Sequence, residues 1–318
     1  MGNFSSVNAK IGGAIAALVA SLVFVTALLV TSPSFASSST TVRFVSPAWV
    51  AEHIEDPQVR ILDVRINPLD YIGGHIPRAV HIADNTFRGP NGRLPVQYWE
   101  TNKIQSLFQQ AGVSSNSHVV IYSDEASILG STMVSYLLER GGLRNIAILD
   151  GGFKAYKEAG LPITKEFPQY TVGNFRFRDK PALRVSLDEV RNLIGNSDIT
   201  FIDPRPAALF AGEVDLFIRN GHIPGAKNIP WPSFTIGEAN QHQLKPLAEI
   251  RALLAQRGIT PDDTIIVTCS TGREATLQYT VLKHLLNYPN VRIYEGSWTE
   301  YSAQPDLPVE TGRDPELL

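Results

Sequence analysis

One loop combines the residue types needed for nucleophilic chemistry. Cys269 follows the apolar run 265–268 and precedes a stretch with helical apolar spacing, 275–286. A loop between the end of a strand and the start of a helix can direct several backbone N–H groups at one anion. Such donors, with Arg273 nearby, are expected to lower the pKa of a thiol from about 8.5. The alternative interpretation of Cys269 is a small buried residue at a strand end.

We therefore predict that Cys269 is a nucleophile that forms a covalent intermediate. Gly272 allows the backbone of the loop to curl around the sulfur. The predicted cradle of backbone N–H groups consists of Ser270, Thr271, Gly272, Arg273, Glu274 and Ala275.

An internal repeat predicts how this loop is positioned. The landmarks of residues 42–163 recur in the same order in residues 184–309. The paired landmarks are ILDVR (61–65) with FIDPR (201–205), GHIPRA (74–79) with GHIPGA (221–226), VVIY (119–122) with IIVT (265–268), and LDGGF (149–153) with YEGSW (294–298). In this repeat Ser123 falls where Cys269 falls in the second half, so only the second half carries the thiol.

Each half is predicted to be an α/β domain. The short apolar runs end at turn-forming residues and indicate buried strands. Helical patterns lie between them: Ser186 and Glu189 form a capping box for a helix through Ile194, and 246–257 has helical apolar spacing. Alternating strands and helices favour a mainly parallel sheet with helices on both faces, once per half.

The domain organisation follows from the repeat. We predict a domain at 42–163 without the nucleophile, a linker at 164–183 and a catalytic domain at 184–312. The linker segment is polar and aromatic, contains Pro168 and Gly173, and has no sustained periodicity.

Composition excludes several classes of protein. The chain has 318 residues, 43% of them hydrophobic, and a formal net charge of −3. That composition excludes disorder, and the charge gives no basic footprint for a nucleic-acid partner. With one cysteine there is no intrachain disulfide and no multi-cysteine zinc site. The seven histidines offer no pair at metal-ligand spacing on one helix, so we expect no metal.

The amino terminus predicts export. Residues 11–30 form an uncharged apolar run after Lys10, and small residues Ser34 and Ala36 precede a Ser/Thr-rich stretch. We expect residues 1–36 to be a signal peptide of the general export route, cleaved after Ala36, with a periplasmic mature protein. The alternatives are an uncleaved membrane anchor formed by 11–30 and export to a thylakoid lumen.

The motifs resemble those of one family, the two-domain rhodaneses, which are sulfurtransferases. The segment 71–77, YIGGHIP, is similar to the family's amino-terminal signature, except that Arg78 stands where glycine is usual. The segment 291–301, VRIYEGSWTEY, matches the carboxy-terminal signature, and 269–274 is similar to the six-residue catalytic loop. The resemblance covers residues 42–312. It implies tandem rhodanese domains and a persulfide on Cys269, with no metal or organic cofactor.

The resemblance leaves the sulfur donor open between thiosulfate, which we favour, and 3-mercaptopyruvate. The loop has neither the basic residue that follows the cysteine in thiosulfate-preferring members nor the Gly-Ser-Gly of mercaptopyruvate-preferring ones. Arg273 is expected to attract a dianionic donor. Leu209 stands where many members place an anion-binding arginine, and Arg219 is the nearest replacement on the chain.

A second substrate-binding group is implied by mercaptopyruvate-type members. There a first-domain Asp and His are proposed to align with a hydroxyl of the loop, and the matching residues here are Asp63, His75 and Thr271. The alternative is that Asp63 and His75 stabilise a turn, because Asp203 and His222 repeat them in the other half.

The expected partners are a small-molecule sulfur donor and a thiol or cyanide acceptor. A protein sulfur acceptor, for which the chain would act as a persulfide carrier, is an alternative of a different class. Rhodanese-like phosphatases have an arginine six positions after the cysteine, and that position here is Ala275, which argues against a phosphate cradle.

Overall fold

Two five-stranded sheets form the core of the protein. The structure is a computed structural model that describes residues 40–237 and 239–314, so the predicted signal peptide lies outside the described residues. The first sheet has the order β1-β7-β6-β2-β3 and the second β10-β9-β11-β12-β8. All strand pairs in both sheets are parallel.

The repeat in the sequence reappears as the same strand order. The strands of the first sheet are β1 (Thr41–Val45), β2 (Val59–Asp63), β3 (Ala79–His81), β6 (His118–Tyr122) and β7 (Asn145–Leu149). Those of the second are β8 (Arg184–Val185), β9 (Ile199–Asp203), β10 (Lys227–Asn228), β11 (Thr264–Val267) and β12 (Val291–Tyr294). Matching each strand to its repeat (β1 with β8, β2 with β9, β3 with β10, β6 with β11, β7 with β12) gives one order for both sheets.

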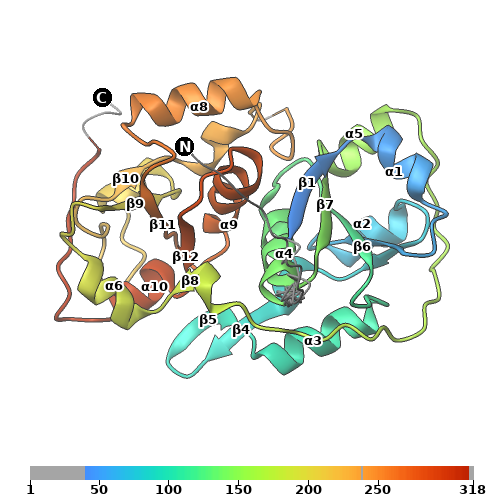
Figure 1. The fold of residues 1–318 in the computed structure, drawn as a ribbon, viewed down its shortest axis with the longest axis horizontal. Coiled ribbons are helices and arrows are strands. Elements are labelled where there is room, and N and C mark those ends of the chain that lie inside the picture. The colour runs from blue at the N-terminus through green and yellow to red at the C-terminus, as the bar shows by residue number, and fades with distance from the viewer. Residues whose placement is uncertain (1–39, 238, 315–318) are drawn as a thin grey trace, which may run out of the picture. The chain divides into compact units, whose positions relative to one another are not determined.

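Helices cover both faces of each sheet (Figure 1). In the first half they are α1 (Pro47–His53), α2 (Pro68–Gly73), α3 (Thr101–Gln110), α4 (Leu129–Arg140) and α5 (Gly152–Glu158). In the second half they are α6 (Leu187–Leu193), α7 (Ala207–Ala211), α8 (Leu247–Gln256), α9 (Ala275–Thr280) and α10 (Ser297–Ser302). Short 3-10 helices span Asp84–Phe87, Pro181–Leu183 and Trp231–Phe234. The predicted fold class, tandem parallel α/β domains, is confirmed.

Local sequence accounts for the helix boundaries that were predicted. The side chains of Ser186 and Glu189 form the capping box that begins α6. The predicted helix at 275–286 is α9 followed by a π-helical turn, Val281–Leu285. Among the described residues no helix is both long and apolar enough to cross a membrane.

An antiparallel hairpin was not predicted. It consists of β4 (Arg88–Asn91) and β5 (Leu94–Tyr98), and Arg88 pairs with Tyr98 across it. Its strands lack the continuous apolar runs of the sheet strands. In Figure 1 the hairpin extends from the first half below β8.

Helices α4 and α9 join the two halves. Every residue of α4 is buried, and one hydrophobic cluster contains side chains of both helices and of both sheets. The Thr132 and Thr276 hydroxyls are 2.8 Å apart, and the Tyr136 and Tyr279 rings meet edge to face at 5.3 Å. The two halves therefore share this cluster, while the opposite face of each sheet packs in a separate cluster of its own half.

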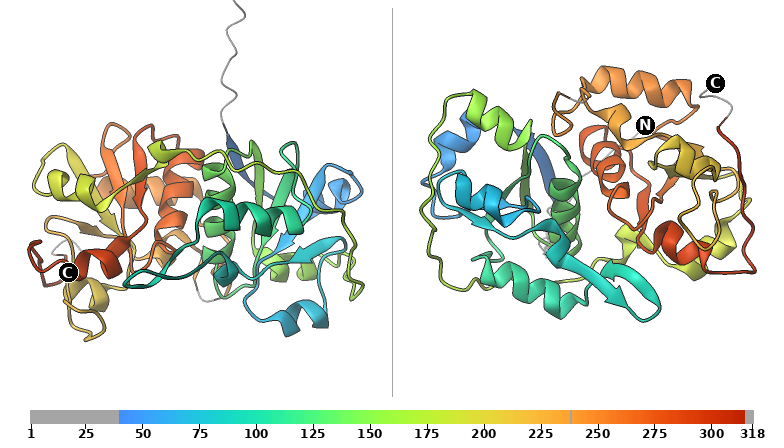
Figure 2. Two further views of the ribbon diagram at one scale, coloured as in Figure 1. Left: turned by 90° about the horizontal axis from the view of Figure 1, so that it is seen from below. Right: turned by 180° about the vertical axis from the view of Figure 1, so that it is seen from behind.

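The predicted linker runs along the first half. Figures 1 and 2 show this segment passing α3 before it reaches β8. Residues 165–180 contain no helix or strand, and backbone bonds such as Phe175 N–H to Val113 O and Arg178 N–H to Gly141 O attach them to the first half. The predicted domain limits stay a prediction, although both sheets lie within them except that β1 begins at Thr41.

A buried ion pair follows the second strand of each half. Arg205 is fully buried, and its Nη2 donates to Asp203 Oδ2 at 2.6 Å and to Gly221 O at 2.8 Å. Arg65 makes the same contacts with Asp63 and Gly74 O. Each pair holds the strand end to the Gly-His-Ile-Pro turn of its half.

We expect Arg205→Met to lower the free energy of unfolding by about 3–5 kcal/mol, because it leaves the Asp203 carboxylate buried without its cation. Urea denaturation followed by circular dichroism measures the change. The matched control is Arg313→Met, which removes an arginine from the exposed pair with Glu213 and should leave stability near that of the unaltered protein. Equal effects of the two substitutions would contradict a special role for the buried pair.

Candidate active site

The Cys269 loop wraps backbone donors around a buried sulfur. Cys269 follows β11 and has no exposed surface. The Gly272 N–H donates to Sγ at 3.1 Å, and the N–H groups of Thr271 and Ala275 also favour a negative charge on the sulfur. Gly272 has φ of +81°, and a Cβ there would lie 2.6 Å from the Glu295 carbonyl oxygen. Only glycine satisfies both constraints, so the close turn requires it.

The carboxy-terminal signature segment, residues 291–301, hydrogen-bonds to the Cys269 loop. The Trp298 N–H donates to Cys269 O at 2.8 Å, and the Thr299 hydroxyl donates to Ser270 O at 2.7 Å. Ser297 Oγ accepts the Cys269 N–H at 3.1 Å and lies 3.7 Å from Sγ. Sequence reasoning matched this segment to the family signature but did not connect Ser297 with the sulfur.

Glu274 occupies part of the predicted cradle. Its carboxylate accepts the Ser270 N–H at 3.4 Å and the Ser270 hydroxyl at 3.2 Å. One of the predicted cradle donors is therefore directed at a side chain of the same loop rather than at Sγ.

The expectation of a lowered thiol pKa is wrong for this structure. Burial raises the pKa of the Cys269 thiol well above its usual range, and the nearby Glu274 carboxylate raises it further, by charge repulsion and by a hydrogen bond to the thiol. The N–H groups of Ala275 and Thr271 act in the opposite direction but are weaker. The position of Cys269 before a helix correctly predicted backbone N–H donors around the sulfur. The pKa also depends on how far packing removes water from the thiol, which the sequence does not show.

Arg273 does not present a free cation. Its Nε and Nη2 donate to Asp84 Oδ2 at 3.0 and 2.5 Å, and Asp84 is itself 2% exposed. The expected attraction of a dianionic donor stays a prediction, which this pairing does not favour because the charge is already neutralised. The pair instead fastens the loop to the first half.

The Arg219 guanidinium is also occupied by hydrogen bonds within the protein. Its guanidinium donates to the carbonyl oxygens of Tyr301, Ser302, Gln304 and Leu307 at the end of α10. The substrate role stays a prediction, which these contacts do not favour because the carbonyls occupy the donors of Arg219.

Asp63, His75 and Thr271 are not brought together. Asp63 pairs with Arg65 and accepts the Tyr122 hydroxyl at 2.7 Å. The His75 ring nitrogens face Tyr71 O at 2.8 Å and Glu166 O at 3.1 Å. Among the described residues neither side chain has a hydrogen bond to the Thr271 hydroxyl. The alternative, that they stabilise the turn, fits the structure.

Two hairpin residues that sequence reasoning missed contact the loop instead. Arg88 Nη1 donates to the Thr271 hydroxyl at 3.0 Å, and the Tyr98 hydroxyl donates to Gly272 O at 2.6 Å. No signal in the sequence connects them with Cys269, because these contacts join residues 183 and 174 positions apart.

The equivalent loop of the first half is filled by a side chain from the second. Ser123 stands at the cysteine position, and its N–H donates to His242 Nε2 at 3.3 Å. The Ser131 hydroxyl lies 2.8 Å from the same nitrogen, and burial lowers the pKa of His242 to about 4. A neutral imidazole therefore accepts the Ser123 N–H, as Ser297 Oγ accepts the Cys269 N–H in the second half.

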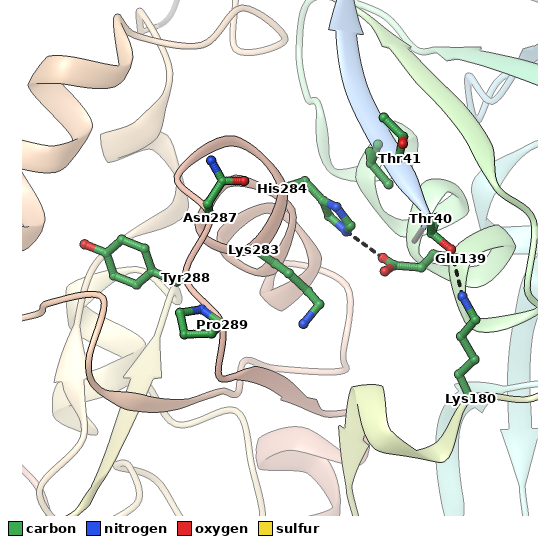
Figure 3. A pocket seen from close by; sticks show the side chains of 10 residues that line it. Thr40, Thr41, Glu139, Lys180, Lys283, His284, Asn287, Tyr288 and Pro289 are labelled. Carbon is green, nitrogen blue, oxygen red and sulfur yellow. Dashed lines mark hydrogen bonds and ion pairs between the residues drawn. The ribbon is translucent and has the colours of Figure 1, made fainter. Parts of the chain in front are cut away.

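A groove of about 480 Å³ is lined by residues outside the Cys269 loop (Figure 3). Within it the His284 ring faces the Glu139 carboxylate at 2.8 Å, and Lys180 donates to the Thr40 hydroxyl at 2.7 Å. Its lining residues are Thr40, Thr41, Val42, Glu139, Lys180, Lys283, His284, Asn287, Tyr288 and Pro289. None of them belongs to the Cys269 loop. In the described part of the chain, no three His, Cys, Asp or Glu side chains group as metal ligands.

Comparison with known proteins identifies the class. Residues 46–159 and 186–304 both match the rhodanese-like domain. A relative from Synechococcus elongatus named "putative thiosulfate sulfurtransferase" is 60% identical over 289 residues, which are 89% of each chain. The sulfur carrier protein TtuD of Thermus thermophilus is 32% identical over 85% of this chain and 97% of its own. The crystal structure of SseA, a 3-mercaptopyruvate sulfotransferase of Escherichia coli, superposes with a TM-score of 0.73 at 30% identity, covering 81% of this chain and 99% of SseA.

The chain therefore belongs to the rhodanese family, with two tandem rhodanese domains. The predicted function, sulfur transfer, is confirmed at the level of this family.

We expect Glu274→Gln to lower the pKa of the Cys269 thiol. A thiolate beside a carboxylate is disfavoured by like-charge repulsion, so removing the carboxylate charge favours the thiolate. Titration of thiolate absorbance near 240 nm measures the effect. Glu249→Gln, which alters an exposed carboxylate on α8, is the control and should leave the thiol pKa unchanged. An unchanged pKa in Glu274→Gln would show that burial alone sets it.

Proposed function

We propose that the protein is a thiosulfate sulfurtransferase that carries sulfane sulfur as a persulfide on Cys269. The observation that carries this proposal is the contact from the Gly272 N–H to Sγ, in a loop whose other donors also favour negative charge on the sulfur. The 60% identity to a relative named for thiosulfate supports the choice of donor.

The first step is attack of the Cys269 thiolate on the outer sulfur of thiosulfate. A bond forms between Sγ and that sulfur, the S–S bond of thiosulfate breaks, and sulfite leaves with the bonding electron pair. The thiol must first lose its proton, and the Glu274 carboxylate, whose charge acts on the thiol, is the proposed acceptor. In the second step a thiol or cyanide attacks the outer sulfur of the persulfide, and Sγ leaves as thiolate.

The buried cradle suits the persulfide intermediate. Backbone N–H groups aimed at an anion stabilise it more strongly in a site without water than in solvent. Because Cys269 has no exposed surface, the donor reaches Sγ only when side chains above the loop move. Loading is therefore coupled to a rearrangement of the loop or of the first-half side chains that touch it.

Two alternatives are supported by particular observations. SseA is named for 3-mercaptopyruvate, and Ser270 stands where thiosulfate-preferring members have a basic residue, which favours 3-mercaptopyruvate as the second candidate donor. The relative named sulfur carrier protein favours a dedicated protein acceptor as the third possibility.

Intact mass spectrometry tests the proposal. We expect thiosulfate to add about 32 Da to the protein, one sulfur atom, and cyanide to remove it. Parallel loading with 3-mercaptopyruvate ranks the two donors by rate. Cys269→Ser is the control and should gain no mass.

Faster loading by 3-mercaptopyruvate would replace thiosulfate as the assigned donor. No gain of mass with either donor, in protein whose thiol is intact, would overturn the proposed enzymatic reaction.

We also propose that the chain is exported and cleaved after Ala36, leaving a periplasmic enzyme. The apolar run 11–30 followed by Ser34 and Ala36 supports this assignment. Amino-terminal sequencing of protein purified from the exported fraction should begin at Ser37. Ala36→Arg should block cleavage at this position, because the site requires a small residue. Recovery of the full chain in membranes would favour the anchor instead, and fractionation of thylakoids distinguishes a lumenal location.

A further inference from the structure

Arg88 lies on the Cys269 loop although it belongs to the half that lacks the cysteine. Its Nη1 donates to the Thr271 hydroxyl at 3.0 Å and approaches Thr271 O at 3.5 Å. Thr271 directly precedes Gly272, whose N–H donates to Sγ at 3.1 Å. The guanidinium is therefore held one residue from the donor that contacts the sulfur.

The hairpin fixes this position. Arg88 stands opposite Tyr98 in the β4–β5 register, and opposed residues project from the same face of a hairpin. Tyr98 is 8% exposed, and its hydroxyl donates to Gly272 O. The side chains of Arg88 and Tyr98 therefore hydrogen-bond to two neighbouring loop residues, Thr271 and Gly272. Both the Cys269 sulfur and Arg88 act on the pKa of the Tyr98 phenol, in opposite directions, which reflects their common proximity.

The other cations around the loop are neutralised. Arg273 pairs with Asp84, and Arg140 pairs with Glu295 and Asp179. Among the described residues Arg88 has no carboxylate within ion-pair distance, and Nη1 is the one group of its guanidinium with a hydrogen bond. Nε and Nη2 make no hydrogen bond with the described residues, so their donors are not used by the protein.

The Nε and Nη2 edge of Arg88 has the chemistry to bind an oxyanion. A guanidinium presents two parallel N–H donors that match the oxygens of a sulfonate or carboxylate. Thiosulfate carries a sulfonate on the sulfur that leaves, and 3-mercaptopyruvate carries a carboxylate close to its transferable sulfur. In both donors the anionic group lies within a few bonds of the sulfur that Cys269 attacks.

We propose that Arg88 binds the anionic end of the sulfur donor at the Cys269 loop, so that the half without the cysteine supplies the donor-binding cation. This inference rests on the proposed sulfurtransferase function and assigns a donor-binding cation at a loop where Arg273 is paired with Asp84. Holding the negative charge of the donor beside Arg88 also stabilises the charge that develops on the leaving sulfite.

The test is the steady-state kinetics of Arg88→Ala with thiosulfate and, separately, with 3-mercaptopyruvate. We expect KM to rise about 10-fold or more for the anionic donor, the loss expected for a charge-assisted hydrogen bond. Arg88→Lys should recover part of the loss, because it keeps the charge but not the paired donors. Arg93→Ala is the matched control: it removes an exposed arginine from the same hairpin and should leave KM unchanged.

A neutral sulfane donor, dimethyl trisulfide, separates binding of charge from support of the loop. We expect Arg88→Ala to load from it at the rate of the unaltered protein. Equal losses with neutral and anionic donors would assign Arg88 to loop structure and overturn the inference, as would an unchanged KM for both anionic donors. If the unaltered protein loads from none of the donors, the proposed function fails first, and this outcome is distinct from loading that is insensitive to Arg88.

Discussion

The packing of α4 against α9 is the contact on which the candidate site depends. Both helices follow the strand-to-helix loop of their half, and their close approach forms one hydrophobic cluster from side chains of both halves. This arrangement places the first-half hairpin on the Cys269 loop, where Tyr98 binds the Gly272 carbonyl. If α4 and α9 did not pack together, the Cys269 loop would keep its backbone conformation. It would lose its contacts with the first half and become exposed to water.

The same packing has two opposing effects on the reactivity of the Cys269 thiol. Excluding water strengthens every N–H contact with a charged sulfur, yet it also makes the free thiolate costly. In the resting structure the second effect prevails, and the Glu274 carboxylate adds to it. The site therefore stabilises the anionic persulfide intermediate better than it stabilises the free thiolate of Cys269. Binding of the sulfur donor must therefore supply part of the stabilisation of the Cys269 thiolate.

Repetition of the fold separates scaffold from chemistry. Asp63 with Arg65, and Asp203 with Arg205, make equivalent buried pairs, so their presence in both halves reflects the architecture. The halves differ at the strand-to-helix loop, which has Ser123 with His242 against its N–H in the first half and Cys269 in the second. The half without the cysteine still contributes to the site, through side chains that reach across.

The sequence by itself determined the repeat, the parallel sheets, the helix starts and the placement of Cys269 in a loop of backbone donors, because these depend on local pattern and short-range chain geometry. It did not determine which charges near that loop are free. Arg273 lies close to Cys269 along the chain and Arg219 was chosen as the arginine nearest to Leu209, but tertiary contacts bind Arg273 to Asp84 and Arg219 to carbonyl oxygens of α10 and the segment after it. Arg88 is distant along the chain, and only the packing of the halves brings it to Thr271. The raised pKa of the thiol was decided in the same way, since desolvation depends on what surrounds a side chain in space rather than on its neighbours in sequence.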